Sequence, residues 1–77
     1  MKSLNEFVEL FAEQFDDTDV NDIQATTEFK KLDEWSSLLA LSLIAMVDEE
    51  FGITVKGEDI RNSITVEDLY KAVKSKE

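Results

Sequence analysis

The chain contains neither cysteine nor histidine. Their absence excludes disulfides, thiol catalysis, histidine acid–base catalysis and zinc sites of the usual ligand types. No apolar run approaches the ~20 residues that a membrane-spanning helix needs, and no stretch resembles a secretory signal. We therefore expect one domain over residues 1–77, held together by packing alone. We also expect it to lie in the reducing cytoplasm and to have no membrane partner.

Basic residues are scarce as well. Eight lysines and arginines stand against 18 aspartates and glutamates, which leaves a formal net charge of −10. Such a charge opposes binding to nucleic acids and to anionic membranes, because both repel an acidic surface. Basic protein surfaces are the natural partners, and the alternative is an acidic surface that serves solubility alone. We expect the protein to be a monomer.

The first helix is predicted over residues 4–15. Ser3 and Glu6 have the spacing of a capping box, in which each side chain accepts a hydrogen bond from the backbone N–H of the other residue. Apolar residues then recur at intervals of three and four, which is typical of an amphipathic helix: Leu4, Phe7, Val8, Phe11 and Phe15. This stripe is expected to face the core.

Residues 16–36 have weak periodicity and are predicted to form an ordered loop with one helical turn near residues 20–24. Four apolar residues are expected to hold it across the core: Ile23, Phe29, Leu32 and Trp35. The loop also has the oxygen-ligand spacing of an EF-hand calcium site, counted from Asp17 to Glu28. The sixth position of that count, where a calcium loop needs glycine, is Asp22. A calcium-binding protein is therefore an alternative hypothesis and not the leading one.

The most hydrophobic helix is predicted to begin at Ser36 or Ser37 and to stop at Gly52, since glycine is favoured just past helix ends. The simplest N-cap is Ser36, whose side-chain oxygen would accept a hydrogen bond from a backbone N–H of the first turn. Ser37 would then take the first helical position. Its hydroxyl would be uncommitted and close to unpaired backbone N–H groups.

At about 100° per residue, this helix has two distinct faces. One face is expected to point to the core: Ala40, Leu43, Ile44, Val47 and Phe51. The other mixes apolar and acidic residues, as protein-binding surfaces do, and forms a candidate partner-binding surface: Leu38, Leu41, Ala45, Asp48 and Glu49. Within it, we expect the long loop to cover Leu38 and to leave Leu41 exposed. An unmodified acidic adaptor that used Leu41 and Asp48 is a second alternative function.

The C-terminal third is predicted to contain an extended link after Gly52, a single helical turn at residues 58–61 and a last helix from Val66 to about Lys74. Thr65 and Asp68 again have the spacing of a capping box. The fold class that follows is all-α. It is a small four-helix bundle with three main helices, one short helix and a long first loop.

Two segments of the chain together resemble an acyl carrier protein. Residues 27–38 contain a Phe-x-x-Leu lead-in at Phe29 and Leu32, followed by Ser37 and Leu38 at the start of the central helix. Residues 48–53 form an acidic end to that helix followed by Phe-Gly-Ile. The spacing between the segments, the helix order, the loop length and the acidic composition extend the similarity over essentially the whole chain.

The resemblance implies a carrier with no enzymatic activity of its own. By position, Ser37 matches the family serine that receives covalent 4′-phosphopantetheine from a phosphopantetheinyl transferase. The arm would carry acyl intermediates as thioesters in fatty acid, polyketide or specialised lipid biosynthesis. The implied partners are the transferase and acyl-chain synthase or transferase enzymes with basic docking surfaces. The resemblance also implies that an acyl chain can lie between helices, in a space lined by Leu43, Ile44 and Val47 opposite Phe7 and Phe11.

Three positions depart from the family pattern. Ser36 stands where the family has aspartate, and Asp33 or Glu34 would replace that charge only in part. Leu39 and Ser42 occupy positions that are often acidic in carriers of fatty acid synthesis. The resemblance therefore leaves open which transferase and which synthase recognise the chain, and an amino-acyl carrier fits it as well.

Overall fold

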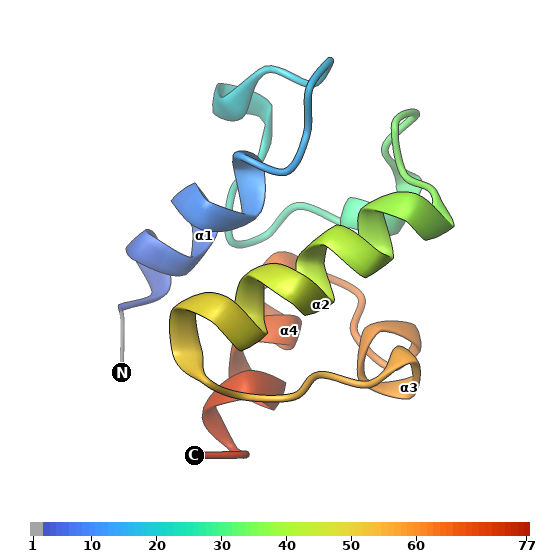
Figure 1. Cartoon of the computed structure of the whole chain (residues 1–77). Coiled ribbons are helices and arrows are strands. Elements are labelled where there is room, and N and C mark those ends of the chain that lie inside the picture. The colour runs from blue at the N-terminus through green and yellow to red at the C-terminus, as the bar shows by residue number, and fades with distance from the viewer. Residues whose placement is uncertain (1–2) are drawn as a thin grey trace.

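The computed structural model describes residues 3–77. These residues contain three helices of at least nine residues and three short helical segments, joined by loops. In chain order they are α1 (Leu4–Ala12), η1 (Val20–Asp22), η2 (Phe29–Lys31), α2 (Ser37–Phe51), α3 (Gly57–Arg61) and α4 (Val66–Lys74). Figure 1 shows α2 crossing in front of α4, with α1 on one side and α3 on the other. The predicted all-α bundle is confirmed. The predicted domain also includes residues 1–2, which lie outside the described part.

The helix-end signals in the sequence form the expected contacts. Ser3 Oγ accepts a hydrogen bond from the Glu6 N–H at 3.2 Å, and the Ser3 N–H donates to the Glu6 carboxylate at 3.3 Å. Thr65 and Asp68 make the equivalent pair of contacts at 3.0 and 3.2 Å. Gly52 ends α2 at φ 67°, a left-handed conformation that glycine adopts without a steric penalty. None of the helices in residues 3–77 has the length and apolar character needed to cross a membrane.

Helix α1 is three residues shorter than predicted. It ends at Ala12, because the N–H groups of Gln14 and Phe15 bond to carbonyls only three residues back. Phe15 is nevertheless buried, and its ring stacks on that of Phe11 with centroids 5.6 Å apart. The tight turn therefore keeps Phe15 in the apolar stripe although the helix has ended.

The core joins aromatic rings from α1 and the long loop to aliphatic side chains from α2 and α4. Phe11 is central to it, with its ring centroid 6.1 Å from that of Phe7 and 5.2 Å from that of Phe29. The largest side chains with less than 2% of their surface exposed are Phe7, Phe11, Phe29, Leu43, Leu69, Val47, Val66 and Val73. Burial of this apolar surface is the main source of stability in a chain without disulfides.

The buried face of α2 is rotated relative to the prediction. Ala40, Ile44 and Phe51, which were expected to point inward, are only half-buried at the edge of the core. Nine of the eleven residues from Ser37 to Val47 are apolar, so the sequence pattern alone does not determine which side faces inward. The buried residues of α2 are Leu39, Leu43, Met46 and Val47.

The long first loop is held by its backbone as well as by its apolar side chains. The N–H groups of Val66 and Glu67, at the start of α4, donate to the carbonyls of Thr27 and Ala25 at 3.1 and 2.9 Å. Its four apolar residues are buried or half-buried, as predicted. Segment η1 matches the predicted turn, whereas η2 was not predicted. The loop therefore satisfies backbone donors that the first turn of α4 would otherwise leave unpaired.

The carboxylate of Glu34 closes the other end of the loop. It accepts hydrogen bonds from the backbone N–H of Asp16 at 2.8 Å, from that of Asp17 at 3.0 Å and from the Thr18 hydroxyl at 2.8 Å. Loss of water contact raises the pKa of Glu34, but these hydrogen bonds outweigh it and leave the pKa below its usual value. Glu34 is therefore a structural residue of the loop.

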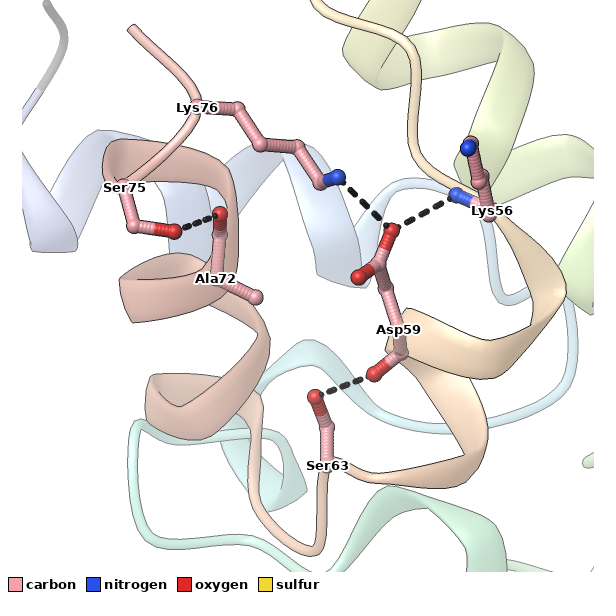
Figure 2. A network of polar contacts seen from close by, with 6 residues as sticks. All are labelled: Lys56, Asp59, Ser63, Ala72, Ser75 and Lys76. Atoms are coloured by element: carbon pink, nitrogen blue, oxygen red, sulfur yellow. Dashed lines mark hydrogen bonds and ion pairs between the residues drawn. The ribbon is translucent and has the colours of Figure 1, made fainter.

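Asp59 connects α3 to the C-terminal segment, as Figure 2 shows. The Lys56 N–H donates to its carboxylate at 2.8 Å, and Lys76 Nζ lies 3.2 Å from the same oxygen. The Ser63 hydroxyl donates to the Asp59 carbonyl at 2.7 Å. The hydrogen bond from Lys56, and next the ion pair with Lys76, hold the pKa of Asp59 below its usual value against the opposing effect of burial.

Asp59 gives the fold a defined sensitivity to acid. Because its folded-state pKa lies below that of the unfolded chain, its contribution is complete above about pH 4 and is lost as the pH falls through the folded pKa. We expect Asp59→Asn to lower the free energy of unfolding at neutral pH by about 1 kcal/mol. Its Tm should also fall less than that of the wild type on acidification.

Thermal unfolding followed by circular dichroism, from neutral pH to about pH 2.5, measures this effect. Asp48→Asn, which changes the net charge equally at an exposed position, is the matched control. If Asp59→Asn and the wild type lost the same stability in acid, Asp59 would not be the group responsible.

Candidate functional site

The N-terminus of α2 presents two serines in different environments. Ser36 is the N-cap, with an extended backbone, and its Oγ accepts a hydrogen bond from the Leu39 N–H at 3.4 Å. Ser37 is the first helical residue and is exposed. Its hydroxyl makes no hydrogen bond to any of residues 3–77. The predicted N-cap is confirmed, and the Ser37 hydroxyl is accessible to a reagent in solution.

Unpaired backbone N–H groups lie at the start of α2, where Ser37 is the first helical residue. The Ser36 carbonyl accepts from the Ala40 N–H at 3.1 Å, which begins the helical hydrogen-bond pattern. The N–H groups of Ser37 and Leu38 have no partner within the described chain. Such groups at the start of a 15-residue helix carry partial positive charge and favour an anion. The site therefore fits an anionic substituent, such as a phosphate ester, on Ser37 Oγ.

The first turn of α2 carries no acidic residue. Ser36 is neutral. Leu39, at a position that is often acidic in acyl carrier proteins, is buried and belongs to the core. Glu34 directs its carboxylate to the residues that follow α1, so it does not replace the missing acid as the sequence suggested. The first turn of α2 therefore adds no negative charge beside Ser37.

A groove of about 420 Å³ opens beside Ser37. Its walls are mostly apolar and come from α2, from α3 and from the end of the long loop. The residues that line it are Lys30, Trp35, Ser36, Ser37, Ala40, Leu41, Ile44, Gly57, Ile60 and Arg61. The half-buried positions of Ala40 and Ile44 therefore have a second role as groove walls.

The space predicted for an acyl chain opposite Phe7 and Phe11 is filled by core side chains in this structure, and its use by an acyl chain stays a prediction. Both rings are fully buried, and Leu43 and Val47 pack into the same core with at most 1% of their surface exposed. Ile44 is the one member of the predicted set that lines the groove. A groove with mostly apolar walls lies on the α3 side of α2. Sequence reasoning did not assign Lys30, Gly57, Ile60 or Arg61 to it, because no local pattern connects these residues to Ser37.

The candidate partner-binding surface lies along one exposed face of α2, which we call the α2 face. All five predicted residues are exposed: Leu38, Leu41, Ala45, Asp48 and Glu49. Leu38 is 74% exposed and Leu41 63%, values that are high for leucine. The prediction that the loop covers Leu38 is wrong, because Leu39 takes the inward position and turns Leu38 outward. The α2 face thus begins next to Ser37 and ends in carboxylates.

In the loop that has the spacing of a calcium site, Asp17 to Glu28, acidic side chains make contacts within the fold. The Asp19 carboxylate accepts a hydrogen bond from the Asn21 N–H at 2.8 Å and caps η1, while Glu28 pairs with Lys31 at 3.2 Å. Within residues 3–77, no three His, Cys, Asp or Glu side chains are arranged to hold a metal ion. The geometry therefore does not favour the calcium alternative.

Comparison with models of known protein families matched residues 5–73 to the family described as phosphopantetheine attachment site. Searches of curated proteins and of solved structures gave no match. The matched region contains α2, α3 and both serines at the start of α2, together with most of α1 and α4. Members of this family carry covalent 4′-phosphopantetheine and are not themselves catalytic. The chain therefore belongs to the phosphopantetheine-binding carrier proteins.

Proposed function

We propose that the protein is an acyl carrier protein whose 4′-phosphopantetheine is attached to Ser37. The observation that carries this proposal is the exposed Ser37 hydroxyl, which begins α2 and has no hydrogen-bond partner in residues 3–77. The neighbouring Ser36 is occupied as the N-cap. When bound, the cofactor supplies a terminal thiol, absent from this cysteine-free chain, on which acyl groups are carried as thioesters.

The attachment step requires little of this chain beyond presentation. Ser37 Oγ forms a bond to phosphorus in the pyrophosphate of coenzyme A, its proton leaves, and the adenosine bisphosphate portion departs. No side chain of residues 3–77 is hydrogen-bonded to the Ser37 hydroxyl to accept that proton, so we assign the base to the phosphopantetheinyl transferase. The unpaired N–H groups of Ser37 and Leu38 stabilise the negative charge of the product.

The α2 face supports docking on basic enzyme surfaces. Leu38 and Leu41 offer apolar contact beside Ser37, and Asp48 and Glu49 offer charge at the far end of the helix. We assign this surface to the transferase and to the acyl-chain synthase or transferase enzymes that use the carrier. Association steered by charge raises the rate of encounter and depends on salt.

The carrier is proposed to act as a cytoplasmic monomer in fatty acid, polyketide or specialised lipid biosynthesis. The groove beside Ser37 supports an acyl cargo over an amino-acyl group, because its walls are mostly apolar and its charged residues, Lys30 and Arg61, repel an ammonium group. A covalent tether also keeps the intermediate at a high effective concentration for each successive enzyme.

Titration of thiols tests the proposed function. The unmodified chain contains no cysteine, so a thiol-reactive reagent should give no signal. After incubation with coenzyme A and a promiscuous phosphopantetheinyl transferase, we expect one reactive thiol per chain. Loading from an acyl donor should block it, and hydroxylamine should restore it. Failure to gain a thiol with several transferases would contradict the carrier role.

Charge reversal on the α2 face should impair recognition by a basic partner enzyme. We expect Asp48→Lys with Glu49→Lys to lower the kcat/KM of the transferase by about tenfold at low salt, with a smaller effect at high salt. Steady-state kinetics with purified carrier measure this. Glu9→Lys with Glu13→Lys changes the net charge equally at exposed positions of α1 and its end, and is the control. Equal losses in both double variants would indicate that only net charge matters.

A further inference from the structure

Two of the eight basic residues of the chain, Lys30 and Arg61, line the groove that Ser37 borders. They lie 31 positions apart in the sequence, and the fold brings them together: Lys30 Nζ donates a hydrogen bond to the Arg61 carbonyl at 2.8 Å. In a chain with a net charge of −10, the groove beside the candidate attachment site thus has positive charge.

Neither Lys30 nor Arg61 forms an ion pair with a carboxylate of residues 3–77. Lys31 pairs instead with Glu28, and Lys76 pairs with Asp59. The hydrogen bond to the Arg61 carbonyl uses one of the three N–H donors of Lys30, and two remain. In an acidic protein, two cations that line one groove and have no acidic partner in residues 3–77 are available for an anion from outside the chain.

The Arg61 head group lies beside Gly57 in the groove. A side chain on Gly57 would lie 3.5 Å from Arg61 Nη1, so the arginine runs back along α3 over the glycine. Both residues line the groove. Alanine at position 57 would make ordinary contact there, whereas a larger side chain would displace the guanidinium. Substitution of Gly57 can therefore test the effect of moving the Arg61 charge without removing that charge.

A phosphodiester is the anion that this arrangement suits. The guanidinium of arginine matches phosphate oxygens with two parallel hydrogen bonds, and lysine adds a compact charge. Attachment at Ser37 creates one phosphodiester on the wall of this same groove. The apolar walls beyond it, formed by Ala40, Ile44 and Ile60, suit the uncharged remainder of the arm.

We infer that Lys30 and Arg61 hold the phosphodiester on Ser37 and thereby keep the arm docked in the groove between α2 and α3. The inference rests on the proposed function. It also accounts for Ser36, which lines the groove where the family pattern has aspartate. An aspartate there would compete for the two cations, whereas the neutral serine leaves them to the phosphate and still caps the helix.

The experiment compares unmodified and phosphopantetheine-modified forms of each variant. The readouts are the ³¹P NMR resonance of the phosphodiester and the Tm of the modified form minus that of the unmodified form. At low salt, we expect modification to raise the wild-type Tm by about 4 °C. Arg61→Gln and Gly57→Leu should each remove more than about half of that rise and shift the ³¹P resonance, and salt at about 0.5 M should do the same.

Lys74→Gln is the matched control, since Lys74 is exposed on α4 and its loss changes the net charge as Arg61→Gln does. It should leave both readouts as in the wild type. The inference is overturned if Arg61→Gln is modified normally and keeps the wild-type Tm difference and ³¹P resonance. A second outcome also overturns it. If the variants differ from the wild type when the arm carries a succinyl group but not when it carries a butyryl group, the anion held would be the carboxylate of the cargo. Failure of wild-type modification would instead count against the proposed function.

Discussion

Ser37→Ala should abolish modification completely. Incubation with coenzyme A and a promiscuous phosphopantetheinyl transferase should leave its intact mass unchanged, whereas the wild type should gain one adduct. Alanine supplies no oxygen nucleophile, and it is well tolerated in the first turn of a helix. Because the Ser37 hydroxyl makes no hydrogen bond within residues 3–77, its removal should not alter the fold. Circular dichroism of the variant checks that point.

Ser36→Ala is the matched control, because it removes the neighbouring hydroxyl instead. It should still be modified, since the nucleophile at Ser37 remains. Ser36→Ala should instead lower stability. Loss of the contact with the Leu39 N–H removes the N-cap of α2 and should lower the free energy of unfolding by about 1 kcal/mol. An adduct that persists in Ser37→Ala would show that the attachment site has been assigned to the wrong residue.

Phe11→Ala should have the largest effect on stability. Phe11 has none of its surface exposed, and its ring lies against those of Phe7, Phe15 and Phe29. It thus joins α1 to the long loop that leads to the candidate attachment site. Removing a buried phenylalanine costs about 3–5 kcal/mol through lost burial and the cavity left behind. A domain of this size has a total stability near the lower end of about 5–15 kcal/mol, so the variant should keep no more than about 2 kcal/mol of stability.

Urea unfolding of the wild type and of Phe11→Ala measures this loss as a change in midpoint at equal slope. Val20→Ala is the control for removing an apolar side chain, because Val20 is 57% exposed. We expect it to change stability by no more than about 0.5 kcal/mol. A Phe11→Ala variant within about 1 kcal/mol of the wild type would mean that the described core is not what holds the domain together.

Features encoded over a few residues were predictable from the sequence. The capping pairs at Ser3 and Thr65, the end of α2 at Gly52 and the extent of α4 all depend on contacts between near neighbours. The orientation of α2 was not predictable in this way. Leu39 and Met46 face inward because of what packs against them, and the helix is too apolar for its own pattern to reveal that side.

The same distinction applies to the site. The position of Ser37 and the capping role of Ser36 follow from a local helix start, and the structure agrees with both. The groove does not follow from any local pattern, because Lys30 and Arg61 come from η2 and α3. Their closeness depends on how the long loop is anchored across the fold. Local patterns therefore indicated the candidate attachment residue but not what lies beside it.

Fragmentation of the modified wild-type protein tests the central claim most directly. The protein is incubated with coenzyme A and the transferase, digested, and the peptide containing both serines is fragmented by tandem mass spectrometry. The account predicts a single phosphopantetheine per chain, with the added mass on Ser37 and none on Ser36. Localisation of the added mass to Ser36, or to any residue outside the start of α2, would contradict it.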